Sequence, residues 1–432
     1  MGQGLTEIAQ QLKDANKKVK LIYAFNGGGK TRLSREFKEL VAPKNGEGVE
    51  EEDGDRSRSK ILYYNAFTED LFYWDNDLEN DEEPKLKVQP NTFTDWVIGL
   101  LKELGEDGNI IANFQRYSKT RVNPVFNDEY KKKGIDYEGN EIDIVVPAYS
   151  EVIFQAPSKR LDDSTNLDSP DDDAKVKGNY DQIKISKGEE SNFVWSVIYA
   201  LQQQAVFALD EPDITNRTTN EFDQLEYIFI DDPVSSLDDS HLIELAIDLA
   251  RLVKSSESKL KFIITTHSPL FYNVLWNEFN NDYYKEYLDG NRKRIYRRGE
   301  SEKYRLNKKL DGTFDLESSN DHPFSYHLFL LSELKGAING GKIEKYHFTF
   351  LRNVLEKTAT FLGCKRWEEL LEKTVEGQRD PIVNRKLNLF SHSAHSGEEV
   401  ADISDDDKKD LEDLVKYLIE AYGFKEQGEQ HG

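Results

Sequence analysis

Cysteine and methionine are almost missing from this chain, which has one of each among its 432 residues. The single thiol, Cys364, excludes an internal disulfide and a zinc site built from cysteines, and it suits a reducing compartment. No apolar run approaches the ~20 residues that a membrane-spanning helix needs, and the N-terminus lacks the apolar core of a signal peptide. We therefore expect a cytoplasmic protein with no membrane partner.

Positive charge is also scarce. Lysine and arginine number 57 against 81 acidic residues, which gives a formal net charge of −24 at pH 7. This charge argues against casual binding to a nucleic acid, although its distribution matters more than its total. Acidic residues concentrate at 47–55, 162–173 and 402–407, whereas residues 291–309 are basic with interleaved tyrosines. That basic segment fits either contact with phosphates and unpaired bases or a charged β-hairpin in solvent.

Residues 21–31 (LIYAFNGGGKT) predict a strand, a glycine turn and the start of a helix over 32–40. Glycines let backbone amides approach phosphate oxygens, while a lysine reaches the outer phosphates and a threonine hydroxyl binds Mg²⁺. Alanine stands at position 24, where the P-loop pattern has its first glycine, and a glycine-rich solvent turn is the alternative. The candidate nucleotide-binding residues here are Asn26, Gly27, Gly28, Gly29, Lys30 and Thr31, with Thr31 also a metal ligand.

Residues 227–238 (YIFIDDPVSSLD) begin as a strand that is apolar on both faces and continue into paired carboxylates. At the carboxyl end of a parallel strand, one carboxylate can hold Mg²⁺ while its neighbour polarises a water beside a phosphate. A second apolar strand, 261–266, ends at His267, and residues 185–191 (ISKGEES) open an apolar helix whose N-terminus can bind an anion. Each segment alone also fits a structural role: a polar turn, a structural histidine or an N-cap.

In this order the segments resemble the motifs of ABC-type ATPases. The P-loop, signature, Walker B, D-loop and H-loop correspond to Asn26–Thr31, Ser186–Glu189, Asp231-Asp232, Ser235–Asp238 and His267. The resemblance implies that Asp231 binds Mg²⁺, that Asp232 stands where many relatives carry a catalytic glutamate, and that His267 contacts the γ-phosphate. Ser186, Gly188 and Glu189 would contact the nucleotide of another subunit. One copy of each motif therefore implies a head-to-tail homodimer with two composite sites.

The fold class expected is α/β, with an ABC-type NTPase domain over 1–285, including a variable insertion at about 75–181, and a mostly helical α+β domain over 286–432. We expect a hairpin near 308–316 and helices near 324–337 and 346–362. On the last helix Arg352 and Glu356 share a face, where a plain salt bridge is the alternative to a site. Arginine, glutamate and a histidine from 388–395 can cleave RNA without metal: the glutamate takes the 2′-OH proton, the histidine protonates the 5′ oxygen, and the arginine neutralises the phosphate.

Residues 350–363 (FLRNVLEKTATFLG) and 390–393 (FSHS), together with the ATPase motifs, resemble PrrC-type bacterial anticodon nucleases. The resemblance covers nearly the whole chain, including 61–74 and 324–327. It implies that Arg352, Glu356 and His392 form the nuclease triad, with His395 the competitor for the acid role. It also implies cleavage of a lysine tRNA beside the wobble base, 2′,3′-cyclic phosphate and 5′-hydroxyl ends, and no metal at the nuclease site.

The same resemblance implies nucleotide control. Hydrolysis of GTP, or ATP, with Mg²⁺ in the NTPase domain would switch the nuclease on, and dTTP would keep it on. A type I restriction-modification enzyme would silence the nuclease until a phage disables that enzyme. Two alternatives stay open: a DNA-associated ATPase of the SMC or RecF kind, and an NTP-dependent defence sensor whose C-terminal half only binds a partner. Against the first, residues 31–185 show no sustained heptad repeat.

Overall fold

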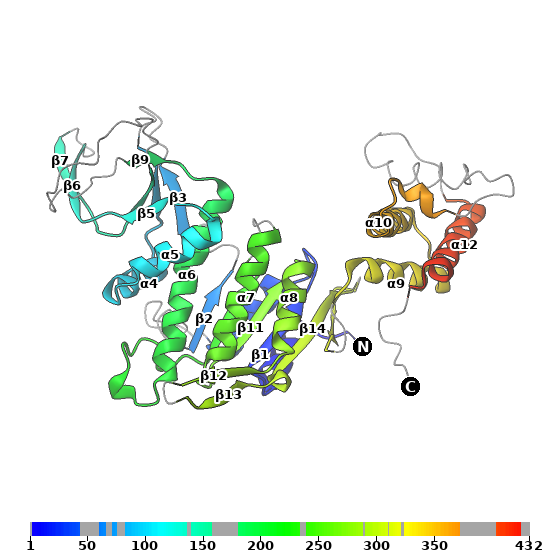
Figure 1. The fold of residues 1–432 in the computed structure, drawn as a ribbon, viewed down its shortest axis with the longest axis horizontal. Helices are drawn as coiled ribbons and strands as arrows, with labels where there is room; N and C mark the ends of the chain where they lie inside the picture. The colour runs from blue at the N-terminus through cyan, green and yellow to red at the C-terminus, as the bar shows by residue number, and fades with distance from the viewer. Residues whose placement is uncertain are drawn as a thin grey trace. The chain divides into compact units, whose positions relative to one another are not determined.

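The computed structural model describes residues 2–43, 60–65, 71–75, 83–135, 140–157, 180–233, 239–287, 290–309, 311–320, 324–371 and 403–424. The chain divides into two compact units, Met1–Ser318 (unit 1) and Ser319–Gly432 (unit 2) (Figure 1). We expected the division after residue 285, and that boundary is too early. The reason is that a strand at Ser301–Lys308 pairs with the N-terminal strand Val19–Tyr23 inside the sheet of unit 1.

Unit 1 is built on a six-stranded sheet with the order β15-β14-β1-β11-β10-β2. Its strands are β1 (Val19–Tyr23), β2 (Ile61–Tyr64), β10 (Tyr227–Asp231), β11 (Lys261–Thr266), β14 (Ser301–Lys308) and β15 (Phe314–Ser318). Neighbouring strands are parallel except for the edge strand β15, which is antiparallel to β14. Every residue of β1 and β10 is buried, as the apolar runs predicted for strands covered on both faces. The α/β class of the N-terminal part is thereby confirmed.

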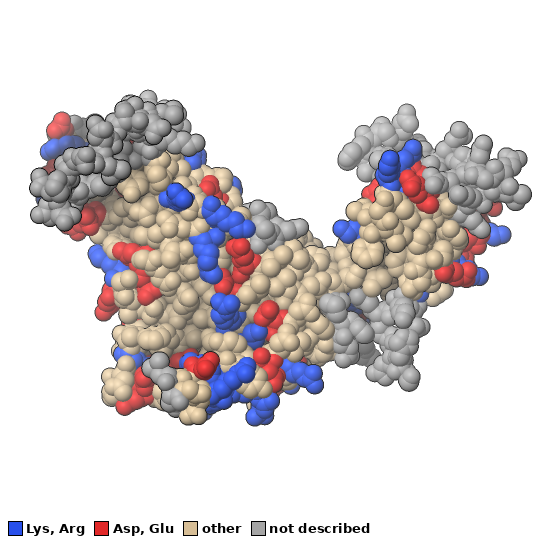
Figure 2. Space-filling view, in the orientation of Figure 1, with Lys and Arg blue, Asp and Glu red and all other residues tan. Residues whose placement is uncertain are grey.

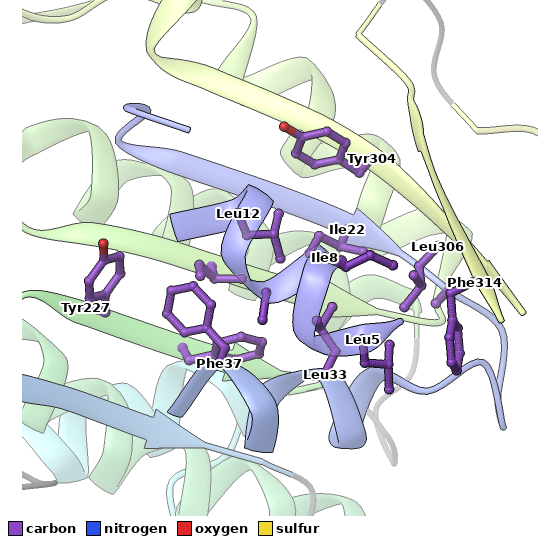
Figure 3. Close-up of a cluster of buried hydrophobic side chains, with 14 of the residues drawn as sticks. Leu5, Ile8, Leu12, Ile22, Leu33, Phe37, Tyr227, Tyr304, Leu306 and Phe314 are labelled. Atoms are coloured by element: carbon purple, nitrogen blue, oxygen red, sulfur yellow. The ribbon is translucent and has the colours of Figure 1, made fainter. Parts of the chain in front are cut away.

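Helices cover both faces of this sheet. They are α1 (Leu5–Asp14), α2 (Lys30–Val41), α6 (Lys187–Asp210), α7 (Asp239–Ser255) and α8 (Pro269–Phe279). Figure 3 shows α1 and α2 packing against the strands through one cluster, in which Ile22, Leu33 and Phe37 are fully buried. Strand side chains alternate between faces. Accordingly Tyr23, next to Ile22, contacts the ring of Tyr272 on α8 with centroids 5.7 Å apart.

The expected insertion forms a second, antiparallel sheet with the order β3-β4-β8-β5, and β9 pairs with β8. Its elements are β3 (Phe72–Asp75), β4 (Lys85–Val88), α4 (Thr92–Glu103), α5 (Asp107–Ser118), β5 (Asn123–Phe126), the hairpin β6 (Tyr130–Ile135) and β7 (Glu141–Val146), β8 (Glu151–Pro157) and β9 (Tyr180–Ile183). Its two helices have 12 residues each. The described part of the insertion therefore holds no long coiled-coil arm of the kind that the SMC alternative requires.

The basic segment lies in unit 1, where it forms β13 (Arg292–Tyr296), the short helix η3 (Arg298–Glu300) and β14. Strand β13 pairs with β12 (Tyr283–Glu286), and basic side chains gather over this hairpin at the lower edge of Figure 2. Lys285 and Lys293 contact Glu257 at 2.9 and 3.0 Å. The hydrogen bond from Lys285, followed by that from Lys293, lowers the pKa of Glu257 to about 2. Only the first part of the segment, β13, lies in a charged hairpin, whereas β14 is a strand of the main sheet, and contact with phosphates and bases stays a prediction.

Unit 2 consists, over its described residues, of α9 (Tyr326–Asn339), α10 (Lys345–Phe361), η4 (Trp367–Leu370) and α12 (Asp405–Tyr422). The helices predicted near 324–337 and 346–362 are therefore confirmed. Leu334, Leu351, Leu355 and Leu418 are fully buried where these helices meet. The strands expected in this half belong to unit 1 instead, because the hairpin of β14 and β15 extends the main sheet. No helix among the described residues is long and apolar enough to cross a membrane.

Candidate functional site

The predicted phosphate-binding turn connects β1 to α2, and its geometry requires glycine. Gly27 has φ +75° and Gly29, the N-cap of α2, has φ +94°, in the left-handed region that favours glycine. A Cβ at Gly28 would lie 2.8 Å from the carbonyl oxygen of Phe25. Positive φ values outside glycine occur elsewhere in the described chain and not at residue 24. Alanine at the first position of the P-loop pattern is therefore unstrained.

Lys30 curls back over this turn. Its ammonium donates to the carbonyl oxygens of Ala24 and Phe25 at 3.2 and 3.3 Å, and it lies 3.5 Å from Oδ2 of Asp232. The side chain is buried, with 7% of its surface exposed. The lysine and the carboxyl end of β10 thus face the same space, as the motif order predicted. A phosphate in this turn would find the ammonium within reach.

Thr31 and Asp231, the two predicted metal ligands, lie side by side although 200 residues separate them. The Thr31 hydroxyl donates to Asp231 Oδ2 at 2.8 Å, and the Thr265 hydroxyl on β11 donates to Oδ1 at 2.5 Å. Burial raises the pKa of Asp231, while the hydrogen bonds from Thr265 and Thr31 oppose that rise. A carboxylate and a hydroxyl are hard oxygen ligands of the kind that Mg²⁺ prefers. The donor set fits the ion.

Asp232 has φ +55°, a conformation that is uncommon outside glycine and concentrates at functional sites. Nδ1 of His267 lies 2.6 Å from its Oδ2, and the His267 backbone N–H donates to Oδ1 at 3.2 Å. Burial would raise the pKa of Asp232, but the hydrogen bond from His267 and the charge of Lys30 hold it below its usual value. The predicted Walker B and H-loop residues therefore meet directly, and the contact of His267 with a γ-phosphate stays a prediction.

The predicted signature forms the start of α6. Ser186 is the N-cap: its backbone N–H donates to Glu189 Oε2 at 2.8 Å, and its hydroxyl accepts from the Glu189 N–H at 3.3 Å. Glu190 is buried and accepts a hydrogen bond from Trp74 on β3 at 2.8 Å. Ser186 therefore caps α6, as the N-cap interpretation predicted, and it is exposed to solvent. Contact of Ser186, Gly188 and Glu189 with a nucleotide stays a prediction.

The predicted nuclease residues Arg352 and Glu356 lie on α10. Arg352 Nε donates to Glu356 Oε1 at 2.8 Å, and the guanidinium carbon lies 5.9 Å from the ring centroid of Trp367. The Arg352 side chain is 18% exposed and that of Glu356 is 46% exposed. The arginine is thus held between a ring and a carboxylate, while the glutamate faces solvent. The salt-bridge alternative is thus present, and the catalytic role of the pair stays a prediction.

Several predicted residues lie outside the described part of the chain. They are the D-loop, Ser235–Asp238, and the two candidate acids, His392 and His395. Their roles stay predictions.

Sequence inspection missed residues that shape both sites. Thr265 could have been found, because it ends an apolar strand next to one that ends in aspartate, and parallel strands end at the same edge. Trp367 beneath Arg352 and Phe314 against Gly29 had no such signal. Both are tertiary contacts between segments that no local pattern connects.

Three comparisons with known proteins bear on this site. No protein-family model matches the chain. A crystal structure of an SMC head bound to the C-terminal winged-helix domain of ScpA aligns at a TM-score of 0.30 and 11% identity, over 70% of this chain and 90% of that one, a likeness too low to carry an argument. An anticodon nuclease of Escherichia coli is 45% identical over an alignment 454 positions long, which covers 100% of both chains. With identity of that level along its full length, this chain belongs to the anticodon nuclease family.

Proposed function

We propose that this chain is a nucleotide-regulated endoribonuclease that cuts a lysine tRNA in its anticodon, beside the wobble base. The observation that carries the proposal is the 45% identity to an anticodon nuclease along the full length of both chains. The hydrogen-bonded Arg352–Glu356 pair on α10 supports it, because these side chains supply two of the three groups that the reaction needs.

In the proposed reaction Glu356 accepts the proton of a ribose 2′-OH. The 2′ oxygen then bonds to phosphorus, the bond from phosphorus to the 5′ oxygen breaks, and His392 gives that oxygen a proton. The products are a 2′,3′-cyclic phosphate and a 5′-hydroxyl. Arg352 neutralises the charge that builds on the phosphate, and its contacts with Glu356 and Trp367 hold the guanidinium in place beforehand. Side chains supply every proton transfer, so we propose no metal at this site.

The NTPase site would regulate this reaction. GTP or ATP would lie on the amides of Gly27–Gly29 with Lys30, and dTTP would act as a regulatory nucleotide. Mg²⁺ held by Thr31 and Asp231 would neutralise charge between the phosphates. Asp232 is shorter than the glutamate common at its position and is tied to His267 at 2.6 Å, which suits slow hydrolysis in a switch.

Assembly and biological role form the last part of the proposal. The exposed N-terminus of α6 at Ser186 suits closure on the nucleotide of a second copy, which gives a head-to-tail homodimer. Membership of the anticodon nuclease family supports silencing by a type I restriction-modification enzyme and release during phage attack. A cytoplasmic location follows from a tRNA substrate.

The test incubates the purified full-length dimer and nucleotide with total tRNA, and sequences the 3′ and 5′ ends of the fragments. We expect cuts beside the wobble base of lysine tRNA, ending in a cyclic phosphate. Loss of a general base or acid costs about 10²–10⁴ in rate, so Glu356→Gln and His392→Ala should stop nicking. Glu412→Gln on α12, also exposed, is the matched control.

Different outcomes contradict different parts. If Glu356→Gln nicks tRNA as fast as the wild type, Glu356 is not the general base. A cleavage step that needs Mg²⁺ after the protein has been activated and then treated with EDTA would sink the 2′-OH mechanism. Fragments cut outside the anticodon would contradict the substrate. Absence of nicking under every nucleotide condition would favour the sensor whose C-terminal half only binds a partner.

A further inference from the structure

Helix α10 exposes aromatic side chains that the packing of unit 2 does not use. Tyr346 is 54% exposed and Phe361 is 88% exposed, and Leu362 at the C-cap is 51% exposed. Among the described residues of unit 2, these are the large hydrophobic side chains that lie mainly in solvent. All three belong to the helix that carries the Arg352–Glu356 pair or to its cap. Apolar surface gathered beside a site is typical of a contact surface.

These side chains form a stripe along the helix. Tyr346, Phe350, Lys357 and Phe361 follow one another at intervals of four, seven and four residues, so they share one face, which we call the α10 stripe. Phe350 is partly buried against the core of unit 2, and its ring contacts that of Tyr346, with centroids 5.3 Å apart. Glu356 lies about 80° around the helix from the Tyr346 edge of the stripe. At 1.5 Å per residue, Phe350 and Phe361 lie about 9 Å before and about 8 Å after it along the axis.

A cation stands in the middle of this stripe. Lys357 is exposed, follows Glu356 directly, and makes no ion pair with an acid in the described part of the chain. Burial and then the charge of Lys357 lower the pKa of His327 on α9. Arg352 and Lys357 are thus two cations five residues apart on one helix, about 8 Å along its axis.

We propose that the α10 stripe is the surface on which the single-stranded anticodon loop lies during cleavage. Lys357 pairs with a phosphate next to the one being cut, and the exposed rings stack on unpaired bases. Proteins recognise RNA loops in this way, because splayed bases offer flat faces to aromatic side chains. This inference rests on the proposed function.

The neighbouring groups favour RNA over a protein partner. Any substrate whose 2′-OH reaches Glu356 brings its adjacent nucleotides within one or two helical turns of that carboxylate, where the stripe lies. A protein partner would call for a continuous apolar patch, whereas the stripe is broken by the charge of Lys357. Cations between aromatic rings complement a chain that alternates phosphates with bases.

The test measures binding of an anticodon stem-loop of lysine tRNA in a Glu356→Gln background, which separates binding from cutting. Each stacked base contributes about 1–3 kcal/mol, so Tyr346→Ala and Phe361→Ala should weaken binding by about 5- to 150-fold. Lys357→Gln should reduce the slope of log K against log salt by about 0.7, the share of one phosphate contact on a single strand. Matched controls are Lys416→Gln on α12, exposed, and Phe207→Ala on α6, 62% exposed. We expect both controls to bind like the parent.

Nicking by the wild-type protein separates the two ways in which the inference can fail. If the wild type cuts the anticodon while all three stripe variants keep the parent's affinity and salt slope, the stripe is not the RNA surface and the proposed function survives. If the wild type does not cut tRNA, the proposed function and the inference fall together. If the variants lose a protein contact in sedimentation while RNA affinity is unchanged, the stripe is a protein interface and the inference is wrong.

Discussion

Alanine in place of Gly29 tests how closely the phosphate-binding turn is packed against the edge of the main sheet. A Cβ at Gly29 would lie 2.7 Å from Cε1 and 3.2 Å from Cζ of Phe314, which is 2% exposed on β15. Two hydrogen bonds between the backbones of Phe314 and Gln3, of 2.9 and 2.8 Å, hold Phe314 in place. The ring therefore has to move while its strand stays in place.

Two costs add up at this position. A left-handed backbone costs alanine about 1–2 kcal/mol, and forcing an extra methyl group into a packed core costs about 1–3 kcal/mol. Gly29→Ala should therefore lower the free energy of unfolding of unit 1 by about 2–5 kcal/mol. Gly27→Ala is the matched control, because Gly27 also has positive φ, +75°, but its Cβ would meet no atom within 4 Å. Gly27→Ala should lower the free energy of unfolding only by the cost of the left-handed backbone, about 1–2 kcal/mol.

Urea unfolding followed by tryptophan fluorescence provides the assay. Four of the five tryptophans, Trp74, Trp96, Trp195 and Trp276, lie in unit 1, so the signal reports mainly on that unit. The free energy of unfolding falls by about 1–3 kcal/mol or more per M urea, so Gly29→Ala should lower the midpoint of unfolding by on the order of 1 M. Phe314→Leu removes the ring atoms that clash, so a double-mutant cycle with Gly29→Ala should recover about 0.5–3 kcal/mol.

Two results would refute this reasoning. Equal stabilities of Gly29→Ala and Gly27→Ala would show that the Phe314 ring yields freely. A cycle with no coupling energy would show that the extra cost of Gly29→Ala does not come from that ring.

Two further predictions concern buried titratable groups. Burial, and then the charge of Lys17, lowers the pKa of Lys303 to about 8, while the unfolded chain keeps the ordinary value of 10.5. Between these pH values the unfolded state binds more protons than the folded state, so stability rises with pH. This group should raise the free energy of unfolding of unit 1 by about 2 kcal/mol between pH 7.5 and 9.5. In urea unfolding, Lys303→Met should not show that rise. His267→Ala removes the main group that orients Asp232, so nucleotide hydrolysis should slow by about 10²-fold while equilibrium nucleotide binding persists. Loss of binding would contradict it.

The elements that the sequence predicts correctly are those determined by the pattern of neighbouring residues. Strands β10 and β11 are apolar runs that end in polar residues, and both the burial and the polar edge follow from that pattern. The Arg352–Glu356 contact is an i, i+4 pair, which needs only a helix to form. Thr31 lies in the first turn of α2, which follows β1, and Asp231 ends β10; they meet because the ends of parallel strands lie at one edge of the sheet.

The misplaced domain boundary has a different cause. Strand β14 carries charges at Lys303 and Arg305, which made its segment look like a solvated hairpin. In the fold it pairs with β1, and Lys303 is buried with its ammonium 2.7 Å from Asn280 Oδ1 and 5.8 Å from the ring centroid of Trp276. A lysine whose ammonium lies over an aromatic ring and donates to oxygen acceptors looks polar in the sequence but is buried like a core residue. Partners so distant along the chain leave no local trace.

Net charge is a weaker guide than the arrangement of a few cations. The total of −24 predicts that a polyanion is repelled in general, yet screening limits each interaction to about a Debye length, ~8 Å at physiological salt. Arg352 and Lys357 lie about 8 Å apart along the axis of α10 and about 140° apart around it, so in the proposed complex each would meet a different phosphate. An acidic surface that repels RNA elsewhere would add selectivity, because binding is favourable only where cations and aromatic rings lie near Glu356. For a nuclease that must spare other RNAs, the acidic composition and the proposed substrate are compatible.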